Sequence, residues 1–92
     1  MRLNILINKL SQLIELEGEK TREQIASFIV GELIGDYDGK YQGLEEKYPD
    51  IRRIAELASD LEWSNGTYSQ LEKMWSEMCR LIRDSKNRDN LD

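Results

Sequence analysis

The spacing of the apolar residues is the feature that most constrains the fold of this chain. In the first segment they recur every three or four residues, which places them on one side of an α-helix: Leu3, Leu6, Ile7, Leu10, Leu13 and Ile14. The chain has only one Val and two Thr, and no sustained alternation of apolar and polar residues. A β-sheet is therefore disfavoured, and the sequence predicts an all-α protein.

A second helix is predicted after Gly18, which ends the first one. Thr21 and Gln24 form a Thr-x-x-Gln capping box that satisfies amides of the first helical turn. The residues expected to face inward are Ile25, Ala26, Phe28, Ile29, Val30, Leu33 and Ile34. Gly31 inside this helix indicates either the close approach of another helix or a tolerated cost of about 1 kcal/mol.

Two more helices are predicted in the second half of the chain. Asp50 follows Pro49 as a plausible N-cap, and the inward residues after it are Ile51, Ile54, Ala55, Ala58 and Leu61. A Ser-Asn-Gly turn at 64–66 precedes a second capping box, Thr67 with Gln70. The inward stripe of the last helix is predicted to be Tyr68, Leu71, Trp75, Met78 and Ile82, with Met74, Cys79 and Leu81 beside it.

Short connections between four amphipathic helices favour an antiparallel four-helix bundle. The connector between the second and third helices is irregular and acidic, because residues 35–50 contain three glycines and Pro49. Residues 41–47 have the pattern for one or two helical turns, with Leu44 in the core. We predict a single helical-bundle domain over residues 1–84 and a frayed polar tail over residues 85–92.

Composition excludes several kinds of chemistry. The chain has no His and one Cys, so imidazole catalysis, an internal disulfide and a Cys-rich zinc site are ruled out. Cys79 is expected to be a small core residue, and the Asp36–Lys47 stretch lacks the ligand order of a calcium loop. We therefore expect no enzyme activity, no metal and no cofactor. The alternative to this expectation is a small enzyme that uses carboxylates, for which the sequence assigns no residues.

Charge and hydropathy narrow the class of partner. The formal net charge is −5, and the basic residues of the last helix alternate with acids, so nucleic-acid binding is disfavoured. No apolar run is long enough to span a bilayer, and no secretory signal is evident, which predicts a cytoplasmic protein that does not bind membranes.

The connector is the most informative feature for function. Tyrosines alternate with carboxylates along it, and the predicted partner-binding residues are Asp36, Tyr37, Asp38, Tyr41, Glu45, Glu46 and Tyr48. One interpretation is a polar loop whose rings lean on the bundle. The other is a recognition surface, since tyrosines anchor interfaces and carboxylates steer a basic partner.

The chain resembles the small helical immunity proteins that protect bacteria from colicin D-type or contact-dependent nuclease toxins. The resemblance covers size, the four-helix layout, acidity, the Leu-Ile-Asn-Lys-Leu segment at 6–10 and the aromatic, acidic connector. It implies an antidote that binds a cognate basic nuclease toxin and covers its active site. No site residue is transferred by position, because the resemblance contains no specific motif.

A different class of function is also compatible with the sequence. The apolar residues outside the predicted stripes are Ile5, Leu16, Leu57, Trp63 and Leu81, more than a four-helix core has room for. Exposed apolar surface of this kind marks an interface, so the alternative is a homo-oligomeric helical regulator or adaptor. This alternative predicts that Trp63 is partly exposed, and it leaves the choice between monomer and dimer open.

Overall fold

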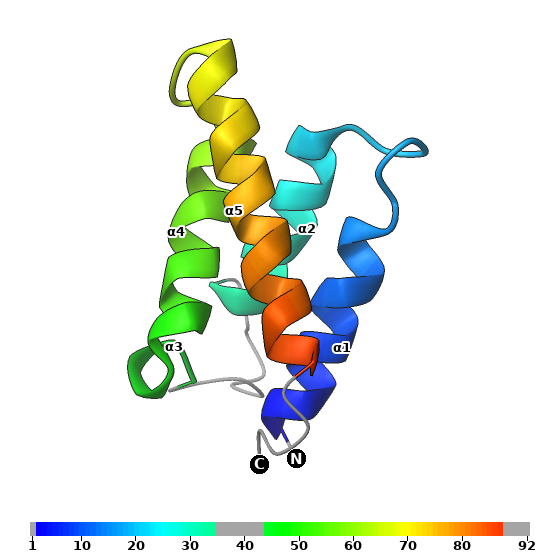
Figure 1. Cartoon of the computed structure of the whole chain (residues 1–92), viewed down its shortest axis with the longest axis vertical. Coiled ribbons are helices and arrows are strands. Elements are labelled where there is room, and N and C mark those ends of the chain that lie inside the picture. The colour runs from blue at the N-terminus through cyan, green and yellow to red at the C-terminus, as the bar shows by residue number, and fades with distance from the viewer. Residues whose placement is uncertain (1, 35–43, 88–92) are drawn as a thin grey trace.

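A computed structural model of the chain describes residues 2–34 and 44–87. Four long helices make up most of it: α1 (Arg2–Ile14), α2 (Arg22–Leu33), α4 (Pro49–Glu62) and α5 (Tyr68–Asn87), with a single turn of helix, α3 (Leu44–Lys47), before α4. The long helices alternate in direction (Figure 1). α1 packs against α2 and α5, and α4 packs against α2, α3 and α5. The predicted antiparallel four-helix bundle is confirmed.

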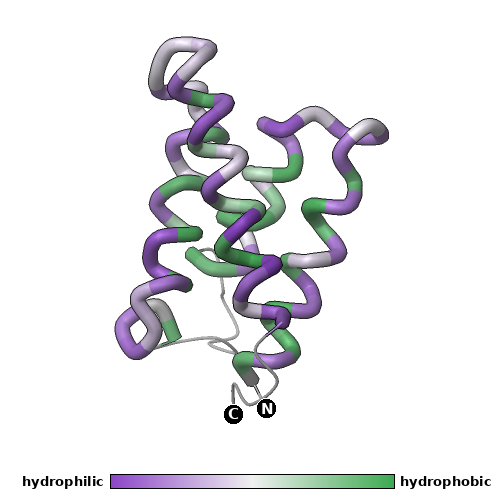
Figure 2. Tube along the Cα trace, in the orientation of Figure 1, coloured by the Kyte–Doolittle hydropathy of each residue, from purple (hydrophilic) through white to green (hydrophobic). Residues whose placement is uncertain are grey.

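The core runs along the axis of the bundle and receives side chains from every helix. Its largest fully buried members are Leu6, Ile7, Leu10, Ile25, Ile29, Ile51, Ile54, Leu57, Met78 and Ile82. Hydrophobic positions recur along each helix between hydrophilic ones (Figure 2). Full burial of each such side chain is worth about 1.5–3 kcal/mol, so the periodicity in the sequence is also the main source of stability.

Both predicted capping boxes are present. The amide of Gln24 donates to Thr21 Oγ1 at 3.1 Å, and the amide of Thr21 donates to Gln24 Oε1 at 3.0 Å. Thr67 and Gln70 form the same reciprocal pair, at 3.2 and 2.8 Å. Each box satisfies two amides that the first turn of a helix leaves without an intrahelical partner, which defines where α2 and α5 begin.

One predicted helix end was wrong, and the structure decides between the two alternatives for Gly31. The N-cap of α4 is Tyr48 and its first residue is Pro49, so Asp50 lies in the first turn. Proline suits this position because the amide it lacks has no intrahelical acceptor. Gly31 is exposed, and a Cβ placed there would meet nothing within 4 Å, so none of the described helices approaches it closely and the alternative of a tolerated cost is the one that fits.

Several apolar residues lie where the stripes did not predict them. Leu57 is in the core with 1% of its surface exposed, whereas Phe28, Ile34 and Tyr68 are 44%, 58% and 80% exposed. α5 also continues to Asn87, three residues past the predicted boundary at 84, and Ser85 is buried. Leu44 is buried, as predicted. Whether residues 41–47 are helical was left open by the sequence; Leu44–Lys47 form one helical turn, and residues 41–43 lie outside the described residues.

Candidate functional site

The predicted binding connector lies largely outside the part of the chain that the structure describes. Asp36, Tyr37, Asp38 and Tyr41 are outside it, and so is the side chain of Glu45. Of the seven predicted residues, only Glu46 and Tyr48 can be placed. The proposal that the seven act together therefore stays a prediction.

Glu46 and Tyr48 differ in how they are presented. Glu46 is exposed on α3, and no described residue pairs with it. Tyr48 is half-buried and packs against the hydrophobic core, while the Lys47 ammonium nitrogen lies 5.5 Å from the centre of its ring. Part of the Tyr48 ring therefore packs at the junction of α3 and α4. Among the predicted binding carboxylates, Glu46 is the one whose side chain the structure describes, and it is exposed.

A shallow depression lies on the outer face of α4. It has a volume of about 490 Å³ and is lined by the exposed Ile34 at the end of α2 and by α4 residues, chiefly Arg52, Arg53, Glu56 and Asp60. The lining carries two cations and two carboxylates around the aliphatic side chains of Ile34 and Ala55. This mixture gives the depression no preference for one sign of ligand charge.

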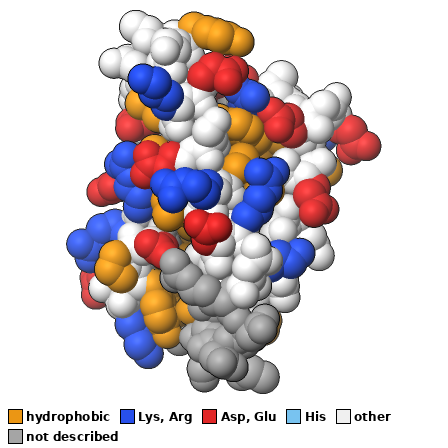
Figure 3. Space-filling model, viewed as in Figure 1, with side chains coloured by type: hydrophobic (Ala, Val, Ile, Leu, Met, Phe, Trp, Pro, Cys, Tyr) orange, Lys and Arg blue, Asp and Glu red, His pale blue; other side chains and the backbone are white. Residues whose placement is uncertain are grey.

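Arg53 is the main ionic link between α4 and α5. Its Nε donates to Glu77 Oε2 at 2.8 Å and its Nη2 to Glu77 Oε1 at 3.2 Å, a two-point contact. The hydrogen bond from Arg53 lowers the pKa of Glu77, and the same bond raises the pKa of Arg53. Acidic and basic side chains are interspersed over this face, so it has no large patch of a single charge sign (Figure 3).

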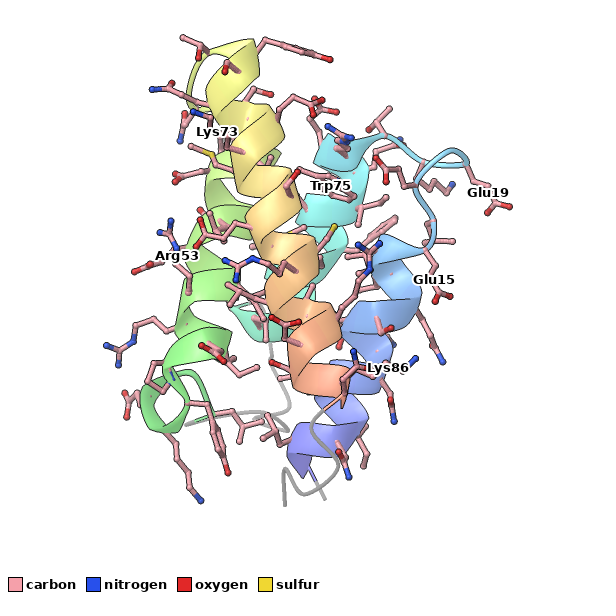
Figure 4. The ribbon with its side chains drawn as sticks, in the orientation of Figure 1. Glu15, Glu19, Arg53, Lys73, Trp75 and Lys86 are labelled. Carbon is pink, nitrogen blue, oxygen red and sulfur yellow. The ribbon has the colours of Figure 1, made fainter. Side chains whose placement is uncertain are left out.

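Arg22, the first residue of α2, connects three segments at the end of the bundle where α1 and α2 are joined. Its guanidinium contacts Glu17, in the connection between α1 and α2, at 2.8 Å and Glu72, in α5, at 2.6 Å. It also lies over the ring of the buried Trp75, 5.2 Å from the centroid. Burial opposes the charge, but the two carboxylates outweigh it and raise the pKa of Arg22. The side chain of Trp75 lies on α5 toward α2 (Figure 4).

The turn between α4 and α5 exposes two aromatic side chains. Trp63, at the C-terminal cap of α4, is 71% exposed, and Tyr68, the first residue of α5, is 80% exposed. The predicted partial exposure of Trp63 is confirmed. The predicted inward stripe of α5 wrongly includes Tyr68, because it extends one turn too far toward the start of the helix. The neighbouring Ser-Asn-Gly turn indicates that α5 begins at the end of the bundle.

Among the described residues, no side-chain cluster is placed to hold a metal ion, and the thiol of Cys79 is buried. Across residues 2–34 and 44–87, no group of three or more His, Cys, Asp or Glu side chains is placed to hold a metal ion. Cys79 is buried, and burial raises the pKa of its thiol to about 11, the opposite of what a nucleophile needs. None of the described helices is long and apolar enough to cross a membrane.

The fold thus defines a small, acidic four-helix bundle with interhelical ion pairs and exposed aromatic residues at one end. Comparison with known protein families, with curated proteins and with solved structures finds no match.

Proposed function

We propose that this chain is an immunity-type antidote, which binds a basic nuclease-type toxin and blocks its active site. The observation that carries the proposal is the exposure of Glu46 on α3, with which no described residue pairs. Glu19, in the connection between α1 and α2, is likewise exposed without a described partner. Other carboxylates are engaged: Glu17 of that connection pairs with Arg22, and Glu32, Glu72 and Glu77 pair with basic residues of other segments.

The chemistry of nucleases supports a partner of this class. A nuclease binds phosphates, so its active site carries positive charge, and exposed carboxylates can occupy that site in place of the substrate. A bundle that presents carboxylates beside its connections suits such a role, because binding residues commonly lie on loops that a packed scaffold holds in position. The acidic, tyrosine-bearing connector at 35–50 is the proposed contact, as its composition predicts.

The test is binding and neutralisation of a nuclease-type toxin, with the product of the neighbouring gene as the first candidate. Replacing Asp36 and Asp38 by Asn and Glu45 by Gln removes three negative charges from the connector. We expect binding at least about tenfold weaker, with a smaller dependence on salt, because charged contacts at interfaces cost about 2 kcal/mol or more when broken. Affinity is measured by calorimetry at two salt concentrations, and protection is measured by toxin activity.

A matched control changes the net charge equally without touching the connector. Asn4, Gln12 and Asn87 are exposed polar residues of α1 and α5, and replacing all three by Lys also adds three positive charges. If this control weakens binding as much as the connector variant does, only the net charge matters and the connector is not the contact. If the wild-type chain does not bind or inhibit the toxin, the antidote function is rejected.

A second candidate function, a homo-oligomeric regulator or adaptor, rests on the exposed apolar residues of α1 and α2. Ile5 is 51% exposed, and Phe28 and Ile34 are also uncovered, which is the kind of surface that a partner or a second copy covers. Sedimentation at micromolar concentration tests the oligomer. A dimer that Phe28→Ser returns to monomer supports this alternative, and a strict monomer removes it.

A further inference from the structure

The two exposed aromatic residues at the α4–α5 turn are not needed to build that turn. Ser64 and Gly66 adopt the positive φ angles, 52° and 145°, and Thr67 with Gln70 caps α5. The side chains of Trp63 and Tyr68 make no described hydrogen bond or ion pair, and both are mostly in water. Keeping two large rings in water forgoes the stabilisation that their burial gives, so their position calls for an explanation outside the fold.

The turn holds these rings on a well-defined backbone. The amide of Asn65 donates to the Asp60 carbonyl at 2.9 Å, and the amide of Ser64 donates to the Leu61 carbonyl at 3.2 Å. The reciprocal Thr67–Gln70 bonds continue this network into α5. Rings presented on an ordered backbone lose little conformational entropy on binding, which is the property of interface anchors.

This end of the bundle also carries most of the net charge. Residues 15–23 and 60–73, which form the two connections here and their flanks, contain seven carboxylates and three basic residues, so their net charge is −4 of the chain's −5. The Arg22 bridge between Glu17 and Glu72 joins the two connections. Glu15 and Glu19 point away from the bundle (Figure 4), and a hydrophobic group projects at this end beside acidic side chains (Figure 3).

We propose that Trp63 and Tyr68, with the neighbouring carboxylates Asp60 and Glu62, form an aromatic tip that docks an arginine-rich segment of a protein partner. A guanidinium fits both parts of the tip, because it stacks on the face of an aromatic ring and pairs with a carboxylate through two parallel hydrogen bonds. Lysine carries the same charge but not the planar fork. Arginine is therefore the side chain that this surface distinguishes.

Charge complementarity also decides against other occupants. An anionic membrane or a nucleic acid is repelled by a surface of net charge −4. In a dimer formed through this end, two negatively charged surfaces would face and repel each other. The aromatic tip lies at the end of the bundle away from α3 (Figure 1), so it is separate from the predicted connector contact. The inference is compatible with the proposed antidote function but does not depend on it.

The experiment uses the isotope-labelled full chain and three short peptides in which glycine alternates with arginine, lysine or citrulline. Citrulline keeps the shape of arginine without its charge. We expect the arginine peptide to shift the indole signal of Trp63 and the amide signal of Tyr68, and to leave the indole of the buried Trp75 in place. The lysine peptide should bind several-fold more weakly, and the citrulline peptide should cause no shift.

Two variants give the matched comparison. Trp63→Ala with Tyr68→Ala should weaken binding of the arginine peptide about five- to thirtyfold, from two exposed cation–π contacts. Phe28→Ala removes an exposed ring from α2 and should leave the affinity unchanged. Thermal unfolding of both variants confirms that the bundle is intact, since neither change removes a core side chain.

Several outcomes overturn the inference. Shifts spread over all acidic regions, equal responses to arginine and lysine, or equal losses in the tip variant and in Phe28→Ala would each show general charge attraction only. A Trp63 signal that depends on protein concentration without peptide would assign the tip to a second copy. If the tip variant binds and neutralises the adjacent toxin normally and the arginine peptide causes no shift at the tip, the tip inference fails while the antidote function stands.

Discussion

At the scale of single residues, Cys79 illustrates how burial sets chemistry. Its thiol has a pKa raised to about 11, first because burial disfavours the thiolate, with the nearby Arg83 only partly opposing this effect. Near pH 8, about one such thiol in a thousand is ionised. The side chain therefore acts as a small apolar group that fills space between helices.

We predict that Cys79 resists thiol reagents in the folded protein. Its reaction with a disulfide reagent near pH 8 should follow the rate at which the bundle opens, and should become immediate in concentrated denaturant. An exposed thiol at Ser76→Cys, in a Cys79→Ala background, is the control on the same helix and should react at once. Equally fast reaction of Cys79 in the folded protein would show that α5 readily separates from the core and exposes the thiol.

The Arg53–Glu77 pair predicts a specific dependence of stability on pH. Because the pKa of Glu77 is lowered in the folded state, the pair stabilises the protein above the unfolded pKa of this carboxyl, and the contribution is lost as pH falls through the folded pKa. Arg53→Gln should therefore cost about 0.2–1 kcal/mol near pH 7, since both side chains are partly exposed. The cost should vanish in acid.

The measurement is urea unfolding of both proteins across the acid range. Arg52→Gln is the matched control, because Arg52 is the neighbouring exposed arginine and no described residue forms an ion pair with it. A cost for Arg53→Gln that does not change with pH, or an equal cost for Arg52→Gln, would mean that the contact with Glu77 adds nothing beyond net charge.

At the scale of helices, replacing glycine by alanine should have opposite effects on stability at two positions. Gly31 lies in α2, and its surroundings leave room for a methyl group, so Gly31→Ala should stabilise the protein by about 0.5–1 kcal/mol. Gly66 has a φ of 145°, and a Cβ there would lie 2.9 Å from Gln70 Oε1. Gly66→Ala should destabilise it. Thermal unfolding compares the two, and equal signs would contradict the described backbone.

The helices could be predicted from sequence because each carries a local signal. Periodic apolar residues gave the four long helices, and the two Thr-x-x-Gln boxes located the starts of α2 and α5. These signals depend on neighbours within one or two turns of the same helix. They need no knowledge of how the helices pack.

The predictions of burial that were wrong concern residues whose surroundings depend on packing between helices. α2 is apolar on more than one side, and its neighbours cover Ile25, Ala26 and Ile29 but not Phe28. The sequence pattern puts Leu57 outside the predicted inward stripe of α4. It is buried because α4 packs against α2, α3 and α5 and so buries a wider face. The spacing of residues along one helix does not tell how many neighbours will surround it.

At the scale of the whole molecule, the net negative charge is concentrated at one end of the bundle, where residues 15–23 and 60–73 carry −4 of the chain's −5. Cross-helix pairs such as Lys9–Glu32 and Arg53–Glu77 link neighbouring helices, and Arg22 pairs with Glu17 of the α1–α2 connection, whereas Glu19 has no described partner. The candidate site was only partly predictable from the sequence. The acidic composition of the connector is visible in the sequence, but the exposure of Tyr68 at the opposite end follows from where the bundle stops.

A chain of this size has little stability to lose, and Leu57 tests how much of it depends on α4. Domains hold about 0.05–0.15 kcal/mol per residue, and truncating a fully buried Leu costs about 2–5 kcal/mol. Leu57→Ala should thus lower the midpoint of urea unfolding strongly and leave a partly unfolded population at elevated temperature. Ile34→Ala removes an exposed side chain and should change the free energy of unfolding by less than about 0.5 kcal/mol. If the two variants unfold alike, the central place of α4 in the core is wrong, because its most enclosed leucine would then contribute no more than a side chain in water.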